Sequence, residues 1–160
     1  MRPAMTDGEL RPSERATDRP LRADAALTFI GRARTPWTTR ADCPRQGSTD
    51  GPECRLELEP PWDAALDGIE GFETLDVLTW LHRSCRDLLV QVPGHGDGSP
   101  RGTFALRSPV RPNPIGLCRV RLVRRECAVL VVRGLDCLDG TPLVDIKPDR
   151  CAFCRSDPQD

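Results

Sequence analysis

The stretch from Arg107 to Leu117, RSPVRPNPIGL, constrains the fold most, because it places three prolines within six residues. Proline lacks a backbone N–H and fixes φ, so this stretch cannot form a helix or a central strand. We therefore expect a rigid, extended loop that carries Arg107, Arg111 and Asn113. Two guanidinium groups and an amide on such a loop suit an anionic or polar ligand. The alternative is a proline-stiffened connector with solvated arginines.

Short strands separated by Gly and Pro turns are expected on both sides of this loop. Residues 118–123 alternate apolar side chains with Arg119 and Arg121, as a half-buried strand does, and residues 128–133 form an apolar, valine-rich run. The two make a hairpin joined near residues 124–127. Further strands are predicted at 27–33, 55–59, 103–107 and 143–146, with a helical turn at 63–67. This pattern predicts an all-β fold, either a small antiparallel barrel or a sandwich, with short helical turns.

Three other segments stand apart from this pattern. Residues 74–90 place Leu75, Leu78, Leu81, Cys85 and Leu88 at helical spacing, so periodicity favours an amphipathic helix there. Residues 1–26 are rich in Arg, Pro, Asp and Glu without apolar periodicity, which predicts a disordered N-terminus. Residues 151–160 read as a polar tail. We expect one domain between them, at 27–150.

Charge is uneven along a chain whose net charge is only −1 over 160 residues. Residues 98–125 contain seven arginines and no acidic residue, so a locally basic surface could neutralise phosphates. The alternative is an arginine-rich composition, since Lys147 is the single lysine. No apolar run approaches the roughly 20 residues that span a bilayer, and no signal-peptide core is present. These features predict a cytoplasmic protein that does not bind membranes.

The eight cysteines do not predict a metal site. Cys151 and Cys154 have ligand spacing, but a structural zinc site needs a second pair. The other cysteines lie among apolar residues, where cysteine behaves as a small hydrophobe. We therefore expect buried, reduced thiols and no metal. A metal or thiol interaction module at Cys151 and Cys154 is the alternative.

A second unusual segment, GLDCLDGTPLVDIKP, runs from Gly134 to Pro148. Its Asp-Gly-Thr-Pro sequence has turn chemistry. Ionisable residues lie between its apolar residues and are expected to be partly buried and to need partners: Asp136, Asp139, Asp145 and Lys147. Pairing of Lys147 with one of these aspartates is the purely structural interpretation.

Taken together, RGTFALRSPVRPNPIGL and GLDCLDGTPLVDIKP closely resemble the signature of the TrmO (TsaA-like) family. Matching blocks occur upstream in the family's order: FIGRARTPW, CPRQG, LELEPPW, LDGIEGF and VLTWLH. The resemblance covers about Leu27 to Pro148. It implies a small antiparallel β-barrel, usually dimeric, that binds S-adenosylmethionine without a Rossmann sheet. It also implies that residues 75–82 form a barrel strand, against the local helical periodicity.

The same resemblance implies a methyltransferase acting on N6 of threonylcarbamoyladenosine at tRNA position 37, beside the anticodon. Carried over residue by residue, the implied cofactor pocket consists of Pro44, Arg45, Gln46, His82, Arg83, Arg107, Leu117, Arg133, Gly134, Leu135 and Asp136. Arginine side chains would take the methionine carboxylate, and Gln46 with backbone groups would hold adenosine.

The reaction requires N6 to be held in line with an already activated methyl group, so no metal is needed. Because the carbamoyl group delocalises the N6 lone pair, we hypothesise a general base, with Asp136, Asp139 and Asp145 as candidates. The substrate-side residues are expected to be Arg111, Asn113, Arg119, Arg121 and Lys147, the arginines at tRNA phosphates.

Three positions depart from the family pattern. Glu73 and Thr74 replace a Ser-His pair, and Asp149 replaces a tyrosine. These departures leave a second hypothesis open, in which the chain is a non-catalytic or differently directed S-adenosylmethionine-binding barrel.

Overall fold

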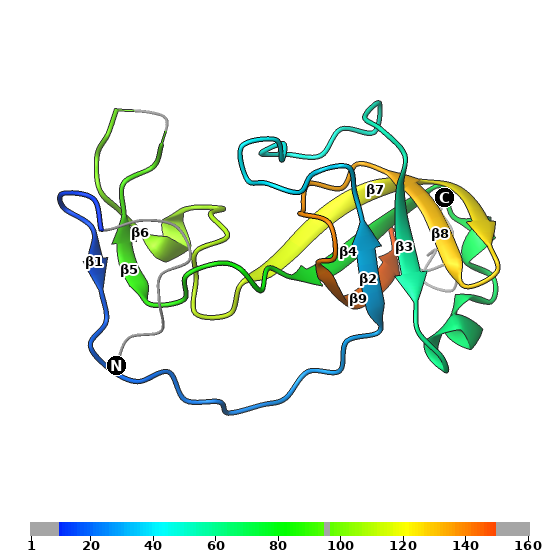
Figure 1. Cartoon of the computed structure of the whole chain (residues 1–160), viewed down its shortest axis with the longest axis horizontal. Coiled ribbons are helices and arrows are strands. Elements are labelled where there is room, and N and C mark those ends of the chain that lie inside the picture. Colours follow the sequence, from blue (N-terminus) through cyan, green and yellow to red (C-terminus); the bar gives the residue numbers. More distant parts are fainter. Residues whose placement is uncertain (1–9, 95–96, 150–160) are drawn as a thin grey trace, which may run out of the picture. The chain divides into compact units, whose positions relative to one another are not determined.

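Six antiparallel strands close into a barrel in the order β2-β3-β8-β7-β4-β9 (Figure 1). The computed structural model describes residues 10–94 and 97–149. The barrel strands are β2 (Gly31–Arg34), β3 (Cys54–Leu58), β4 (Thr74–Trp80), β7 (Ile115–Glu126), β8 (Val129–Arg133) and β9 (Pro142–Pro148). The antiparallel barrel predicted from the sequence is therefore confirmed.

The barrel core follows from alternation along β2, β3 and β4, and from a continuous buried run in β8. In β4 the side chains of Leu75, Val77 and Thr79 are fully buried while their neighbours are half-exposed. Such a period of two is what a sheet with one buried face requires. The same face of the other strands adds the largest fully buried side chains, which include Leu56, Val120, Leu130 and Leu143.

The strand at β4 corrects the helix that periodicity alone favours at residues 74–90. Antiparallel pairing with β9 runs from Leu75 opposite Pro148 to Thr79 opposite Leu143. This long-range ladder overrides the local helical spacing: it buries Leu75, Val77 and Thr79 on one face and leaves Leu78 on the other, half-exposed face. The strand inferred from the family resemblance is the one observed.

Residues 10–26, 81–94 and 97–115 form a second compact unit, distinct from the unit that contains the barrel. Its three-stranded sheet has the order β1-β5-β6, from β1 (Arg15–Ala16), β5 (Leu88–Gln91) and β6 (Arg101–Gly102). The sequence grouped residues 27–150 into one domain, whereas this division sets Leu81–Ile115 apart from the barrel unit.

The prediction of a strand at residues 103–107 is wrong. Residues Thr103–Ala105 form a 3₁₀ turn, η3, in which the Leu106 N–H donates to the Thr103 carbonyl at 3.2 Å. The Thr103 hydroxyl explains the turn, since it donates to the Leu88 carbonyl at 2.7 Å and accepts from Gln91 Nε2 at 2.8 Å. Buried polar groups must be paired, and this pairing fixes residue 103 against β5.

The N-terminal segment contains one short ordered element that its composition did not predict. Arg15–Ala16 pairs with β5, and the Glu14 carboxylate accepts the backbone N–H groups of Val92 and Arg11, each at 3.0 Å. Residues 17–26 have no helix or strand.

Two 3₁₀ turns and one hairpin complete the barrel unit. The turns are η1 (Trp62–Leu66) and η2 (Ile69–Gly71), so the expected helical turn at 63–67 is confirmed. β7 and β8 form the predicted hairpin, with Cys127 at a left-handed φ of 54° in its turn. Within residues 10–94 and 97–149, no helix is long and apolar enough to cross a membrane.

Truncation of Leu130 tests this barrel core. Leu130 is 0% exposed, so Leu130→Ala removes packed methyl groups and leaves a cavity. We expect a loss of about 2–5 kcal/mol in the free energy of unfolding, measured by urea denaturation. Val123 is 39% exposed and provides the control. Val123→Ala is expected to cost at most about 0.5 kcal/mol, and equal losses for the two variants would contradict the assigned core.

Candidate functional site

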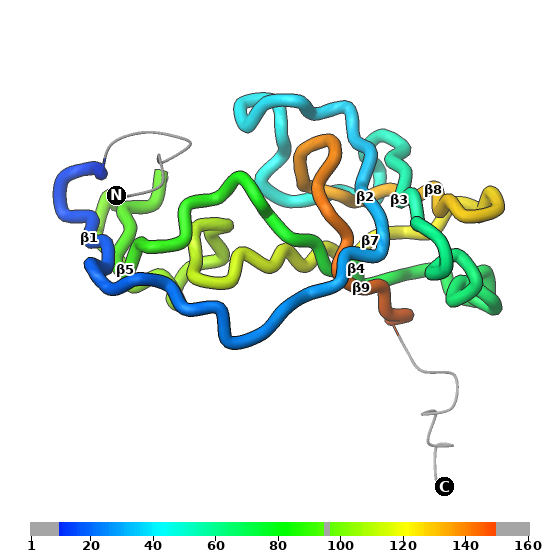
Figure 2. Tube along the Cα trace, turned by 60° about the horizontal axis from the view of Figure 1, so that its bottom comes forward, coloured from blue at the N-terminus to red at the C-terminus, as the bar shows by residue number. Residues whose placement is uncertain are grey.

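The loop between β2 and β3 lies beside the turn between β8 and β9. Figures 1 and 2 show the two segments, cyan and orange, next to each other at one end of the barrel strands. The first carries Pro44, Arg45 and Gln46, and the second begins with Gly134, Leu135 and Asp136. Two sets of predicted cofactor residues, far apart in sequence, are thereby brought together within one compact unit.

Asp136 makes the contacts that join these segments. Its Oδ2 accepts the Gly47 backbone N–H at 3.2 Å, and its Oδ1 accepts the Cys118 thiol at 2.6 Å. Its backbone carbonyl accepts the Cys43 thiol at 3.2 Å. Three donors from the β2–β3 loop and β7 therefore converge on one residue.

Glycine makes this approach possible. A Cβ atom on Gly47 would lie 1.7 Å from the Gly134 carbonyl oxygen. Gly134 itself has φ +115°, and a Cβ there would lie 2.9 Å from the Arg119 carbonyl oxygen. Both positions require a residue without a side chain, since one is in backbone contact and the other is in a conformation that L side chains rarely adopt.

Arg45 and Gln46 are the polar side chains of this loop that remain available. Both are exposed, and neither has a hydrogen bond or ion pair with another described residue. Leu117, 53% exposed, precedes Cys118 on β7 and adds an apolar surface. A guanidinium, an amide and an apolar side chain are suitable partners for a carboxylate, an adenosine edge and a thioether-like chain.

Arg133 and Leu135 are also predicted to contact the cofactor, but both side chains make their contacts within the barrel unit. The Arg133 guanidinium donates to the Gly51 carbonyl at 2.8 Å and to Glu53 at 3.0 Å. The Leu135 side chain is 1% exposed. Gly134 is buried as well, so neither residue 134 nor residue 135 presents an accessible surface at this end of β8.

Five predicted site residues belong to the other compact unit. His82, Arg83, Arg107 and Asn113 are exposed there, and Arg111 is half-buried. Arg111 Nη2 donates to the carbonyls of Leu106 at 3.0 Å and Thr103 at 3.4 Å. This guanidinium therefore fastens the proline-rich loop, whereas the alternative drawn from the sequence had solvated arginines there.

Asp139 and Asp145 have local partners. Asp139 accepts the Thr35 backbone N–H at 3.1 Å and lies 3.7 Å from Arg34. Asp145 accepts the Ile146 N–H at 2.9 Å and pairs with Lys147 at 2.5 Å. Pairing of Lys147 with a neighbouring aspartate is thus the observed arrangement.

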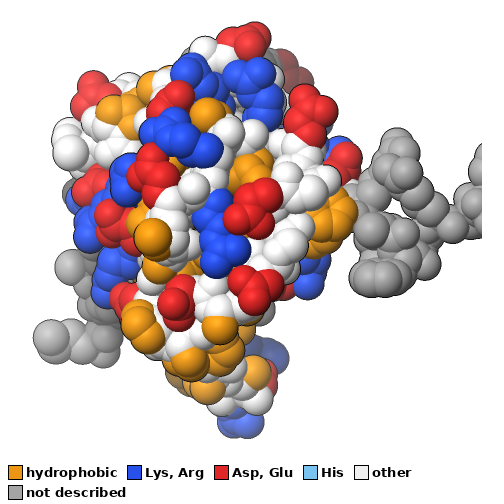
Figure 3. Space-filling model, turned by 90° about the vertical axis from the view of Figure 1, so that its right-hand side faces the viewer, with side chains coloured by type: hydrophobic (Ala, Val, Ile, Leu, Met, Phe, Trp, Pro, Cys, Tyr) orange, Lys and Arg blue, Asp and Glu red, His pale blue; other side chains and the backbone are white. Residues whose placement is uncertain are grey.

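The arginines of the predicted basic stretch are mostly neutralised on the barrel. Arg119 binds Asp76 at 3.0 Å and Asp149 at 3.0 Å, and Arg124 binds Glu53 and Glu126. On the face in Figure 3, acidic and basic side chains are intermixed. Hydrogen bonds from Arg124 and then Arg133 hold the pKa of Glu53 below its usual value. Arg121, by contrast, is exposed with no ion pair or hydrogen bond among the described residues.

Of the six cysteines that the structure describes, Cys54, Cys118 and Cys137 are buried, and Cys43 and Cys85 are half-buried. Burial raises the pKa of Cys54 to about 11 and that of Cys137 to about 12, so both stay protonated at neutral pH. Cys127 is the exception, exposed in the hairpin turn. In the part of the chain that the structure describes, no group of three or more His, Cys, Asp or Glu residues is arranged to hold a metal. Cys151 and Cys154 lie outside the described residues.

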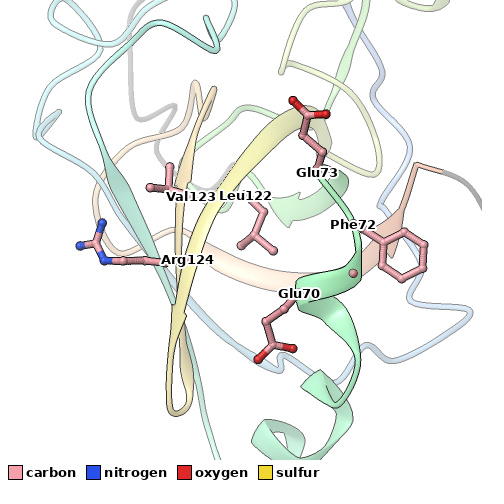
Figure 4. Close-up of a pocket in the computed structure, with 7 residues that line it drawn as sticks. Glu70, Phe72, Glu73, Leu122, Val123 and Arg124 are labelled. Atoms are coloured by element: carbon pink, nitrogen blue, oxygen red, sulfur yellow. The ribbon is translucent and has the colours of Figure 1, made fainter.

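A cavity of about 360 Å³ lies between the start of β4 and the middle of β7 (Figure 4). Its lining comprises residues 70–73 and 122–124, and the Glu73 carbonyl accepts the Leu122 N–H at 2.8 Å. Glu73 is one of the departures from the family pattern, but no residue predicted to bind cofactor or substrate lines this cavity.

Sequence reasoning missed the roles of Gly47, Cys43 and Cys118. All three contact Asp136, yet each reads in sequence as an ordinary loop glycine or a small apolar residue. A glycine directly after the Pro-Arg-Gln segment was the available signal, because close backbone approach is a frequent reason for glycine in a loop.

The fold and site define a small closed β-barrel in which the loop that carries Pro44, Arg45 and Gln46 is held against the turn that follows β8. Residues 32–152 match the family described as tRNA-methyltransferase O N-terminal domain, and the chain belongs to that family. The resemblance inferred from the sequence is therefore confirmed.

Individual relatives agree with this assignment. A probable S-adenosyl-L-methionine-binding protein VirR from Rhizobium radiobacter is 53% identical over 91% of this chain and 83% of its own length. The tRNA (adenine(37)-N6)-methyltransferase of Escherichia coli is 36% identical over 74% of this chain and 55% of its own. A crystal structure of TrmO from Pseudomonas aeruginosa matches with a TM-score of 0.63 and 30% identity, covering 86% of this chain. The chain spans 61% of that structure.

Adding a methyl group at Gly47 tests the contact between the two loops. Gly47→Ala must push the 44–46 segment away from Gly134, and we expect faster tryptic cleavage after Arg45, followed by mass spectrometry. Gly71→Ala is the matched control, since a Cβ there has nothing within 4 Å. Unchanged cleavage in Gly47→Ala would contradict the close packing.

Proposed function

We propose that this chain is an S-adenosylmethionine-dependent methyltransferase that modifies N6 of threonylcarbamoyladenosine at tRNA position 37. The observation that carries the proposal is the Asp136-centred junction, which places Arg45 and Gln46 beside the end of β8. Membership of the tRNA-methyltransferase O family, and the name of the Escherichia coli relative, support the acceptor and the position.

The polar groups at this junction fit S-adenosylmethionine. Arg45 offers a guanidinium for the methionine carboxylate and Gln46 an amide for the adenosine. Leu117, proposed from the family resemblance, is exposed on β7 on the face opposite to Cys118. When bound, the cofactor supplies an activated methyl group. The proposed cofactor contacts of His82, Arg83 and Arg107 rest on the family resemblance alone.

Among the three candidate bases, we favour Asp145. Asp136 is held by buried or backbone donors, and Asp139 fixes the Thr35 backbone. The Asp145 carboxylate is 43% exposed, and its side-chain partner Lys147 is 62% exposed. Exposed ion pairs contribute little stability, so a substrate would displace this one at small cost. Its carboxylate would then accept the N6 proton while the barrel holds the nitrogen in line.

We further propose that the protein works as a cytoplasmic homodimer. In the unit formed around β5, Phe104 is 82% exposed and Leu89 is 50% exposed. Large apolar side chains at such exposure are suited to burial against a second copy.

A second candidate function is cofactor binding without this methyl transfer. It is favoured by the positions that depart from the family pattern: Asp149 is occupied by an ion pair with Arg119, and Glu73 and Thr74 replace the expected Ser-His pair. Several relatives carry names that mention binding alone, including the one from Rhizobium radiobacter.

Methyl transfer from radiolabelled S-adenosylmethionine distinguishes the two. We expect label in tRNA that carries the threonylcarbamoyl group and none in matched tRNA without it. Asp145→Asn is expected to lower kcat about a hundredfold, whereas Asp139→Asn keeps kcat near the wild-type value. Cofactor binding with no label in either tRNA would establish the second function instead.

The salt dependence of tRNA binding tests the role of Arg121. A free guanidinium that meets a phosphate releases a counterion, so Arg121→Ala should flatten the plot of log Kd against log salt by about 0.7 units. Arg55→Ala is the matched control, because Arg55 is already paired with Glu126 at 2.9 Å. Filter binding over a salt series gives both slopes, and identical slopes for the two variants would remove Arg121 from the interface.

A further inference from the structure

Cys118 makes a polar contact in surroundings that are otherwise apolar. It lies on β7, 4% exposed, in an otherwise apolar strand face with Val120. Its thiol points to a carboxylate: Cys118 Sγ lies 2.6 Å from Asp136 Oδ1. A thiol is a weak donor, and a charged acceptor strengthens the hydrogen bond that it makes, so this contact orients the carboxylate as well as filling space.

The thiol acts as a donor in this contact. Burial, and then the negative charge of Asp136, raise the pKa of Cys118 well above neutral pH. The thiol therefore keeps its proton and the carboxylate remains the acceptor. A neutral donor compensates Asp136 for part of the solvation it loses beside the core, without adding a second charge.

The other carboxylate oxygen of Asp136 faces the loop that carries Arg45 and Gln46. Asp136 Oδ2 accepts the Gly47 N–H at 3.2 Å, directly after Gln46. Fixing Oδ1 from β7 sets the plane of the carboxylate, and that plane sets where Oδ2 meets the loop. Cys118 thus influences the position of Arg45 and Gln46 through Asp136. It is not itself taken to contact a ligand.

We propose that Cys118 is a positioning residue, whose thiol orients Asp136 so that the Pro44–Arg45–Gln46 segment is held in its binding geometry. The inference rests on the proposed function, since that segment is taken as part of the cofactor site. It assigns Asp136 to holding the loop rather than to proton transfer.

Three substitutions separate donation from packing. Cys118→Ser keeps a donor of similar size, Cys118→Ala removes the donor and leaves a cavity, and Cys118→Val fills the space without a donor. Cys54→Ala is the matched control, because Cys54 is 1% exposed on β3 and its thiol reaches only the Pro52 carbonyl, at 3.7 Å. It creates a comparable cavity away from Asp136.

The first readout is tryptic cleavage after Arg45 in the protein without cofactor. We expect cleavage about tenfold faster in Cys118→Ala and Cys118→Val, and near wild-type cleavage in Cys118→Ser and Cys54→Ala. If circular dichroism shows that Cys118→Ala or Cys118→Val does not fold, the other of these two variants provides the test. Equal cleavage in all folded variants would overturn the proposal.

The second readout is calorimetric binding of S-adenosylmethionine, with KM and kcat for methyl transfer. Variants without the donor should bind about tenfold more weakly and raise KM for the cofactor, while kcat at saturation stays unchanged. Serine should restore the affinity. A fall in kcat at unchanged KM would overturn the positioning role. If the wild-type protein binds no cofactor, the proposed function fails, while the cleavage result still decides whether Cys118 holds the loop.

Discussion

Closure of the barrel through β9 is the constraint on which the rest of the structure depends. β9 pairs with β2 on one side and with β4 on the other, so no barrel strand is left with an open edge. Closure fixes where β8 ends and β9 begins, and therefore it also fixes the position of the turn between them. Asp136 lies in that turn, and the β2–β3 loop is held wherever Asp136 is held. The candidate site is thus a consequence of barrel closure and of one carboxylate.

The sequence predicted most of this barrel because strands with one buried face carry a period of two. Residues 118–123 show that signal plainly, whereas residues 128–133 form a continuous apolar run, and both are strands. Prediction from periodicity failed where long-range contacts decide: residues 74–80 follow pairing with β9, and Thr103 turns to satisfy its hydroxyl against Leu88 and Gln91. Composition likewise gave no sign that Arg15–Ala16 would pair with β5.

The candidate site was predictable in part, and for a different reason. Family resemblance named both the 44–46 segment and residues 133–136, but nothing local shows that Gly47 touches Gly134 or that Cys118 donates to Asp136. These contacts join residues that are separated by tens of positions, and their partners are set by strand order. The ion pairs within the basic stretch are hidden in the sequence for the same reason, since Arg119 meets Asp76 and Arg124 meets Glu53 only once the barrel has formed.

Charge pairing on the barrel also limits how such a protein can engage RNA. Arginines already bound to carboxylates release few counterions on meeting a phosphate, so they add little to affinity. The guanidinium groups left over in the described chain include Arg45, Arg107 and Arg121. Residues 27–80 and 116–149 contain 11 basic and 15 acidic residues, so the formal charge of the barrel unit is 11 − 15 = −4, which disfavours non-specific attraction to nucleic acid. Under the proposed function, recognition would then rest on contacts to an unstacked base, which is how loop nucleotides of RNA are selected. An acidic barrel with an exposed Pro-Arg-Gln loop fits the proposed selection of one nucleotide better than binding to RNA at large.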